Sequence, residues 1–327
     1  MTYEQNAHNN LIPLGKTGVM VSRIGIGTLT WGDPAESRAL SSPRIAYGHA
    51  NPGKDQKDAL DVCLQSGINF IDTAAMYGLG ASERMIGKLT KGRNVVIATK
   101  YPKHFIITFT HSLPDNLEES LKRLGRTTVD LYQVHYPFPW LSIPGTMKLM
   151  ADAVEKGRVR AVGVSNFSAR QMRLAHKVLS QYGIPLASNQ VQYSLLHRKP
   201  ETDGVLDACR ELGITLIAYM PLSMGALTGK YDEKHKPDGL RKYLGFYRGR
   251  KFQKVLQLVN LLRTIGEKYS KSPGQVALRW LMEQEGVIPI PGVRNGRQAE
   301  QAAGTLLFSL SSVDREAIDQ ASRQFQQ

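Results

Sequence analysis

Short runs of apolar, β-branched residues alternate with helix-type segments along almost the whole chain. Strands that alternate with amphipathic helices pair in parallel through right-handed crossovers. Eight such units in 327 residues fit a closed (β/α)8 barrel, the TIM-barrel form of an α/β fold, better than a doubly wound sheet. The eight predicted strands are residues 21–28, 68–74, 95–100, 131–136, 159–165, 187–192, 215–221 and 287–292.

Local signals at helix ends agree with this alternation. Serine caps and a proline in the first turn mark helix starts, and glycines mark helix ends. They predict helices over residues 82–89, 114–124, 168–180 and 273–285. No linker divides the chain, so we expect a single barrel domain over residues 1–327, with residues 1–10 flexible. Residues 31–55 and 241–250 are expected to form long loops at the C-terminal face, where barrels carry their sites.

Polar residues stand where several predicted strands end. Asp72, Lys100 and His135 each close an apolar run, and Tyr77 follows Asp72 by five residues. Each alone has an ordinary structural explanation, as a helix cap, a surface lysine, a core histidine or a packing aromatic. In a barrel, however, all these strand ends face one mouth. Four further residues end later strands: Ser165, Asn166, Gln190 and Tyr219.

The first four residues suit proton delivery to a carbonyl oxygen. A free phenol has a pKa of about 10, and we expect the Lys100 ammonium to lower the pKa of Tyr77. Asp72 would hold Lys100 charged and oriented, and the His135 imidazole would orient the carbonyl. None of these groups is a reductant, and we expect no metal site because no metal-ligand cluster accompanies them. A bound hydride donor is therefore implied.

The chain resembles the aldo-keto reductase family, including its branch of pyridoxal reductases and potassium-channel β subunits. The resemblance rests on FIDTAAMYG, ASERMIG, SLKRLGRTTVDLYQVHYP, GRVRAVGVSNF, NQVQYSLL and PIPGVRN. It implies that Asp72, Tyr77, Lys100 and His135 form a catalytic tetrad. It also implies NADPH or NADP+ bound on a barrel without a Rossmann domain, and reversible reduction of an aldehyde or ketone with Tyr77 as the acid.

The resemblance also assigns the cofactor site residue by residue. Ser165, Asn166 and Gln190 match positions that bind the nicotinamide carboxamide, and Tyr219 matches the aromatic stacked on its ring. Family members often have Glu-Asn where this chain has Gln301-Ala302, so its adenine contacts are expected to differ. The positions that match pyrophosphate contacts are Leu222, Gly225, Gly229 and Lys230, with Arg241 as a further phosphate contact. The positions that match adenosine-phosphate contacts are Gly292, Arg294 and Gln298, together with Gln301.

Arg294 favours NADPH over NADH, because its charge and planar geometry suit a 2′-phosphate. The substrate pocket, for a small-molecule carbonyl compound, is expected to involve Trp31, Tyr77 and His135. Its rim would come from the loop over residues 32–55, with Arg44, Tyr47 and His49, and from Tyr136, Phe138 and Trp140.

The net charge of the chain indicates which classes of partner it can bind. Lys and Arg number 42 against 28 Asp and Glu, a net charge of +14, which favours anionic partners. No nucleic-acid-binding motif accompanies this charge, so a phosphorylated cofactor is favoured over nucleic acid.

Cys63 and Cys209 are expected to be buried thiols in a reducing compartment, with redox regulation as the alternative. With no secretory signal or membrane-length apolar run, we expect a cytoplasmic protein without a membrane partner; an oligomer is left open.

Two other functions compete with catalysis at this point. A cofactor-binding regulatory protein could use the same scaffold with little turnover, as the potassium-channel β subunits do. A basic nucleic-acid-binding protein is the other alternative.

Overall fold

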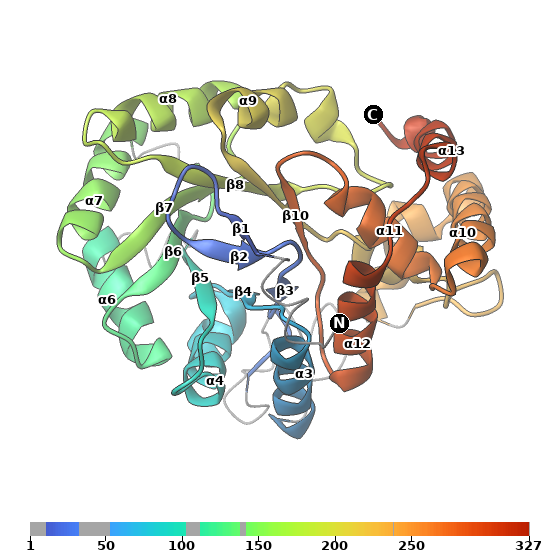
Figure 1. The fold of residues 1–327 in the computed structure, drawn as a ribbon, viewed down its shortest axis with the longest axis horizontal. Coiled ribbons are helices and arrows are strands. Elements are labelled where there is room, and N and C mark those ends of the chain that lie inside the picture. Colours follow the sequence, from blue (N-terminus) through green and yellow to red (C-terminus); the bar gives the residue numbers. More distant parts are fainter. Residues whose placement is uncertain (1–10, 33–52, 103–111, 138–141, 238, 327) are drawn as a thin grey trace.

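The computed structural model describes residues 11–32, 53–102, 112–137, 142–237 and 239–326. Eight parallel strands lie side by side in chain order, and backbone bonds from Gly25 to Pro289 (3.0 Å) and from Gly27 to Pro291 (2.9 Å) close the ring. The predicted (β/α)8 barrel is therefore confirmed (Figure 1). The strands are β3 (Ile26–Gly27), β4 (Phe70–Asp72), β5 (Val96–Tyr101), β6 (Val129–Val134), β7 (Val159–Ser165), β8 (Leu186–Gln192), β9 (Thr215–Tyr219) and β10 (Val287–Ile290).

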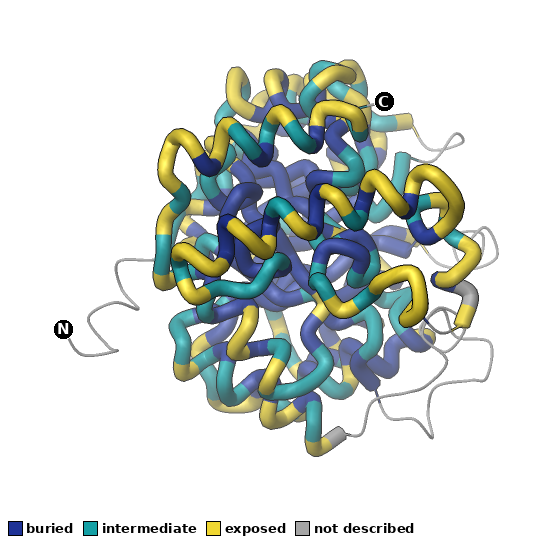
Figure 2. The backbone as a smooth tube through the Cα atoms, turned by 90° about the vertical axis from the view of Figure 1, so that its right-hand side faces the viewer, coloured by how far each residue is buried: buried dark blue, intermediate teal, exposed yellow. Residues whose placement is uncertain are grey.

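Helices surround the strands and cover their outer side (Figure 1). Two further helices, α10 (Gly249–Tyr269) and α13 (Ser312–Ser322), pack beside α11 (Pro273–Met282) at one edge of the barrel. Burial follows this arrangement, with a buried centre and helices exposed on their outer faces (Figure 2). The helices around the barrel are α3 (Gly53–Gln65), α4 (Ala81–Leu89), α6 (Leu113–Leu124), α7 (Ile143–Glu155), α8 (Ala169–Ser180), α9 (Val205–Leu212), α11 (Pro273–Met282) and α12 (Gly296–Gly304).

Side chains alternate along each strand between the barrel interior and the helix layer. Phe70 and Leu131 belong to the interior cluster, whereas Ile71 and Tyr132 pack in the core between strands and helices. Asp72 follows Phe70 by two residues, so it shares the inward face at the carboxyl end of β4. The same alternation aims the polar residues of the neighbouring strands into one mouth.

The predicted strand over residues 21–28 is wrong in its extent. The chain there forms two elements: β2 (Met20–Ser22), which pairs antiparallel with β1 (Leu11–Pro13), and the short barrel strand β3. A side chain at Gly25 would collide with Phe70, since a Cβ there would lie 2.6 Å from its ring. Apolar residues of the hairpin pack on the inward side chains, and Gly15 N–H donates to Thr215 Oγ1 (2.7 Å) at the start of β9. The hairpin therefore covers the amino end of the barrel.

The predicted helix ends are close to those observed. The three serines that precede α6, α8 and α11 each form a capping box, and α6 ends at Gly125 with φ +63°. The helix predicted over residues 273–285 ends earlier, at Met282. Residues 241–250 are not simply a loop, because they contain 3-10 turns and the start of α10. Residues 1–10 and most of 31–55 lie outside the described residues.

Cys63 lies in α3 and Cys209 in α9, and both are buried. Burial raises the pKa of each thiol to about 12. The thiolate is the reactive form of cysteine, so burial and a raised pKa both disfavour reaction of these thiols at neutral pH. Among the described helices, none is both long and apolar enough to cross a membrane.

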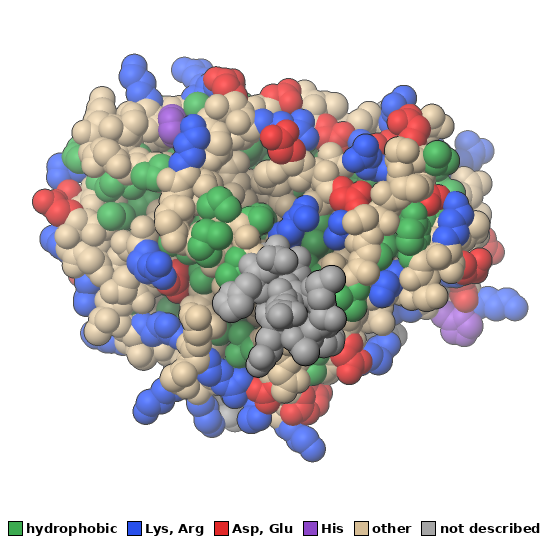
Figure 3. Space-filling model, viewed as in Figure 1, with side chains coloured by type: hydrophobic (Ala, Val, Ile, Leu, Met, Phe, Trp, Pro, Cys, Tyr) green, Lys and Arg blue, Asp and Glu red, His purple; other side chains and the backbone are tan. Residues whose placement is uncertain are grey.

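Charged side chains are mixed on the face seen in Figure 3, where lysines and arginines lie among acidic and apolar groups.

Candidate active site

A buried ion pair lies at the carboxyl ends of β4 and β5. Lys100 is 0% exposed and Asp72 2% exposed, and their Nζ and Oδ2 atoms are 2.6 Å apart. Lys100 also donates to the Thr73 carbonyl (2.8 Å). The second carboxylate oxygen, Asp72 Oδ1, accepts hydrogen bonds from Gln190 (2.8 Å) and Gln133 (3.4 Å). The carboxylate is therefore held on both oxygens, and it fixes the position of the ammonium.

Tyr77 stands beside this pair, in the turn between β4 and α4. Its hydroxyl lies 3.5 Å from Lys100 Nζ. Its ring and the His135 ring form a T-shaped pair, with centroids 6.3 Å apart and an interplanar angle of 78°. His135 in turn stacks on Tyr136 at 5.1 Å. The structure therefore brings Asp72, Tyr77, Lys100 and His135 together at one mouth.

The electrostatics of Tyr77 differ from the expectation. Burial raises the pKa of Tyr77 well above its ordinary value, and the nearby Asp72 carboxylate raises it further. The ring is only half-buried by surface area, but the hydroxyl lies among buried strand ends, so desolvation dominates. The net direction is therefore opposite to the predicted lowering by Lys100, first because the hydroxyl is desolvated and second because the Asp72 carboxylate lies nearby. Burial also lowers the pKa of Lys100, against the opposing effect of Asp72.

A second polar cluster joins the ends of β7, β8 and β9. Asn166, in a left-handed conformation with φ +61°, donates to the His135 carbonyl (3.1 Å) and to Ser165 Oγ (3.0 Å). Ser165 donates to the backbone carbonyl of Gln190 (2.9 Å), and Tyr219 OH donates to Asn166 Oδ1 (3.0 Å). All four of the later strand-end residues thus share the mouth with His135.

The segment after β9 carries cationic side chains. It forms the 3-10 turn η3 (Ser223–Thr228), with left-handed glycines at Gly225 (φ +100°) and Gly229 (φ +78°). Lys230 Nζ lies 4.8 Å from the Tyr231 ring centre, and the Tyr231 hydroxyl accepts from Arg241 (3.2 Å). Leu222 is half-buried against the core beside η3. Two cationic side chains thus lie beside the η3 segment.

A third group lies where α12 begins. Gln298 Oε1 accepts from the Arg294 backbone N–H (2.9 Å), and Gly292 is exposed with open space around it. Gln301 Oε1 accepts from Ser272 Oγ (2.7 Å), the residue that caps α11. Arg294 and Gln298 are thus neighbours, and Gln301, in the second half of α12, joins this helix to the start of α11.

Trp31 has a different place from the one expected. It is 1% exposed, and its indole N–H donates to the Val293 carbonyl (2.6 Å). The next residue, Gly32, exchanges two 3.1 Å bonds with the buried Gln56 side chain. Trp31 therefore lies directly behind the residue that precedes Arg294, with almost no surface left for a substrate. The expected rim residues Arg44, Tyr47, His49, Phe138 and Trp140 lie outside the described residues.

Sequence reasoning missed two polar residues of this site. Gln133 precedes His135 by two positions, so strand alternation alone could have placed it in the mouth. Glu83 is a buried carboxylate of α4 that accepts from Thr99 Oγ1 (2.6 Å) and Arg123 (2.6 Å). It belongs to the quoted ASERMIG motif but lies behind the strand that carries Lys100.

Comparison with known proteins decides the family. The sequence model of the Aldo/keto reductase family matches residues 23–323. The chain belongs to the aldo-keto reductase family. It is 33% identical to the chloroplastic pyridoxal reductase of Arabidopsis thaliana over 93% of this chain and 84% of that protein. It is 35% identical to the aldo-keto reductase yakc [NADP(+)] of Schizosaccharomyces pombe over 85% and 89%.

Solved structures agree with this family. The glycerol dehydrogenase AKR11B4 from Gluconobacter oxydans superimposes with a TM-score of 0.82, at 26% identity over 97% of this chain and 96% of that one. As an aldo-keto reductase, this protein is an oxidoreductase of the class that acts on carbonyl compounds and generally uses nicotinamide cofactors. The residues present suit such a cofactor, since amide and hydroxyl groups lie beside the half-buried Tyr219 ring and cations lie beside η3.

Proposed function

We propose that this aldo-keto reductase interconverts an aldehyde or ketone and its alcohol with NADPH as cofactor, and that Tyr77 is the proton donor. The observation that carries the proposal is the position of the Tyr77 hydroxyl, 3.5 Å from Lys100 Nζ, with the Tyr77 ring packed against the His135 ring at 6.3 Å between centroids. A phenol, an ammonium and an imidazole converge there on one mouth. A carbonyl oxygen in that mouth would meet two groups able to donate a hydrogen bond.

The raised pKa keeps the Tyr77 phenol protonated at neutral pH, which is the form needed for reduction. An alkoxide is a much stronger base than a phenolate, so the protonated phenol remains an adequate donor. His135 would orient the carbonyl oxygen by hydrogen bonding. Lys100, fixed by Asp72, would stabilise the phenolate left after proton transfer. The bound cofactor supplies the hydride.

The same proposal assigns the cofactor contacts. Ser165, Asn166 and Gln190 would hold the nicotinamide carboxamide, and the Tyr219 ring would stack on the nicotinamide. Lys230 and Arg241 would bind the pyrophosphate, over the segment with Leu222, Gly225 and Gly229. Arg294 would bind the 2′-phosphate, with Gln298 and Gly292 beside it and Gln301 near the adenine. The printed name of the yakc relative, which includes NADP(+), supports the phosphorylated cofactor.

Relatives named for pyridoxal and for glycerol show that one scaffold serves different substrates. The substrate should therefore be found with a panel of pyridoxal, small aldehydes, aromatic aldehydes, sugars and ketosteroids. NADPH oxidation is followed with each compound. We expect at least one small carbonyl compound to be reduced.

Tyr77→Phe tests the role of the phenol. It should abolish reduction while NADPH binding, measured by fluorescence, stays within about twofold, because the variant loses only the hydroxyl. Near-normal turnover in the variant would refute the assignment of Tyr77. Tight NADPH binding by the wild type without turnover on any panel member would favour a cofactor-binding regulatory protein instead.

A further inference from the structure

A buried arginine lies outside the candidate active site, in the connection between β8 and α9. Arg198 is 5% exposed and precedes the 3-10 turn η2 (Lys199–Glu201). Its Nε and one terminal nitrogen each bind one oxygen of Glu201, both at 2.7 Å. This two-bond arrangement is specific to the planar guanidinium.

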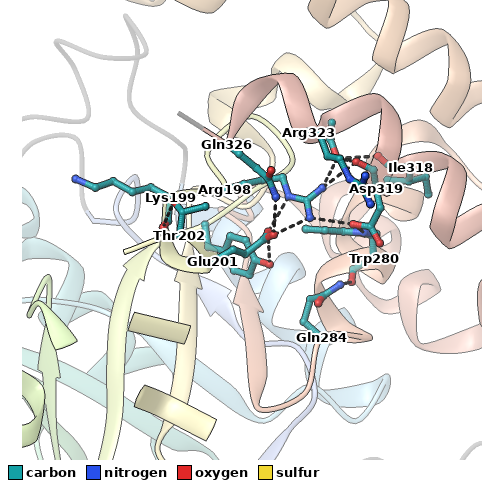
Figure 4. A network of polar contacts seen from close by, with 12 residues as sticks. Arg198, Lys199, Glu201, Thr202, Trp280, Gln284, Ile318, Asp319, Arg323 and Gln326 are labelled. Carbon is teal, nitrogen blue, oxygen red and sulfur yellow. Dashed lines mark hydrogen bonds and ion pairs between the residues drawn. The ribbon is translucent and has the colours of Figure 1, made fainter. Parts of the chain in front are cut away.

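The remaining donors of Arg198 reach the C-terminal helix α13 (Figure 4). One nitrogen donates to Ser322 Oγ (2.7 Å), and another lies 2.9 Å from Asp319 Oδ1. The guanidinium also lies over the Trp280 ring of α11 at 4.8 Å, and Trp280 donates to Asp319 (3.2 Å). Arg198 therefore joins the β8–α9 connection to α11 and α13.

Glu201 extends the same cluster in two directions. It accepts from Tyr193 OH (2.8 Å) at the end of β8 and from Gln326 (3.2 Å) near the C-terminus. The Tyr193 and Trp280 rings also form a T-shaped pair, with centroids 5.8 Å apart. We call Tyr193, Arg198, Glu201, Trp280 and Asp319 the Arg198 cluster.

The turn before Arg198 contacts the proposed cofactor segment directly. Ser194 and His197 exchange backbone bonds of 3.1 and 3.0 Å, which makes residues 194–197 a tight turn. Ser194 Oγ lies 2.9 Å from Ser223 Oγ, and both serines are buried. Tyr193 N–H donates to the Tyr219 carbonyl (3.3 Å). Tyr193 of the cluster thus contacts the end of β9 through the backbone, and the adjoining Ser194 contacts the segment after β9 through its side chain.

That segment needs external support. Met220, Ser223 and Met224 have φ values of +51°, +47° and +53°, in the left-handed region that side chains other than glycine disfavour. Such conformations persist only where the surrounding structure determines them. The Ser194 hydroxyl bonds one of these residues directly.

We propose that the Arg198 cluster positions the segment over residues 219–229 for dinucleotide binding. The cluster fixes the turn over residues 194–197 against α11 and α13, and Ser194 transmits that position to Ser223. This inference rests on the proposed function, because the proposal assigns residues 219–229 to the cofactor.

Arg198→Lys and Ser194→Ala test the two ends of this connection. Lysine keeps the charge but lacks the planar fork that donates two parallel bonds to Glu201 while also reaching Ser322, and alanine removes the hydroxyl pair. Each should weaken NADPH binding about fivefold, within the range that coupled positions show, while the carbonyl KM at saturating NADPH stays unchanged. In the double variant the loss of NADPH affinity should be smaller than the product of the losses in the two single variants.

Arg173→Lys is the matched control, since Arg173 binds both oxygens of Glu211 (2.6 and 2.7 Å) on the surface. It should leave NADPH binding unchanged.

Hydrogen exchange of the protein without cofactor gives a second measurement. Amides of residues 219–229 should exchange faster in both variants and not in the control. A lower melting temperature with unchanged NADPH affinity and unchanged exchange at residues 219–229 would overturn the inference and leave a merely structural cluster. If the wild type does not bind NADPH, the proposed function fails, and the exchange result alone then decides whether the cluster positions this segment.

Discussion

Gln190 donates a 2.8 Å hydrogen bond to Asp72 Oδ1, while the other oxygen of the same carboxylate holds Lys100 at 2.6 Å. Gln190 and Asp72 are 118 positions apart in the chain. Family resemblance assigns Gln190 to the cofactor, yet its amide also orients the carboxylate behind the proposed proton donor. Gln190 therefore belongs both to the proposed cofactor contacts and to the group of residues around the proposed proton donor.

Gln190→Leu should therefore affect more than cofactor binding. We expect kcat at saturating NADPH to fall about tenfold, since a hydrogen bond to a charged group contributes about 1.5–3 kcal/mol. Gln133→Leu is the matched control, because its bond to the same oxygen is 3.4 Å long. That variant should lose less than about threefold. Equal kcat losses in the two variants, or a Gln190 effect confined to NADPH affinity, would contradict this prediction.

The pH dependence of both reaction directions follows from the raised pKa of Tyr77. A raised pKa keeps the phenol protonated until the pH passes that raised value. Reduction needs the protonated form, so kcat for reduction should stay flat from neutral pH to about 10, the ordinary phenol value. Alcohol oxidation needs a base and should accelerate as pH rises over the same interval. Steady-state rates of both directions across this range provide the measurement, and a reduction rate that falls with an apparent pKa near 7 would show that another group is the acid.

Trp31→Phe distinguishes a substrate contact from a supporting one. Phenylalanine lacks the indole N–H that bonds the Val293 carbonyl at 2.6 Å. We expect NADPH binding to weaken about fivefold, because the Val293 carbonyl loses the bond that positions the backbone just before Arg294, and such a bond contributes about 1 kcal/mol. The carbonyl KM at saturating NADPH should change less than about twofold, since almost no Trp31 surface is exposed. A changed carbonyl KM with normal NADPH affinity would restore Trp31 to the substrate pocket.

Arg294→Ala tests the choice of cofactor. A charge-assisted contact to a 2′-phosphate contributes about 1.5–3 kcal/mol, so NADPH affinity should fall about thirtyfold. NADH lacks that phosphate and should bind within about twofold of wild type. Fluorescence titrations with both cofactors measure the ratio. Arg297→Ala, at an exposed position of α12, serves as the control. Equal losses for NADPH and NADH would refute the role proposed for Arg294.

The candidate site was predictable where it depends on local order. Asp72 and Lys100 end apolar runs, and strand alternation turns both toward the barrel mouth. The elements that were not predicted depend on contacts with segments far away in the chain. The helix α10 was missed because residues 241–250 look like an irregular basic stretch, although their turns lead into a helix that packs on α11 and α13.

The alternation of strands and helices, the helix caps and the polar residues at strand ends can be read from the order of residues, because these signals are local and periodic. The bond from Gln190 to Asp72, the support of Val293 by Trp31 and the rise in the pKa of Tyr77 arise only in the folded chain. Each of these depends on distances between segments far apart in the chain and on the exclusion of water. Neither quantity can be read from the order of residues.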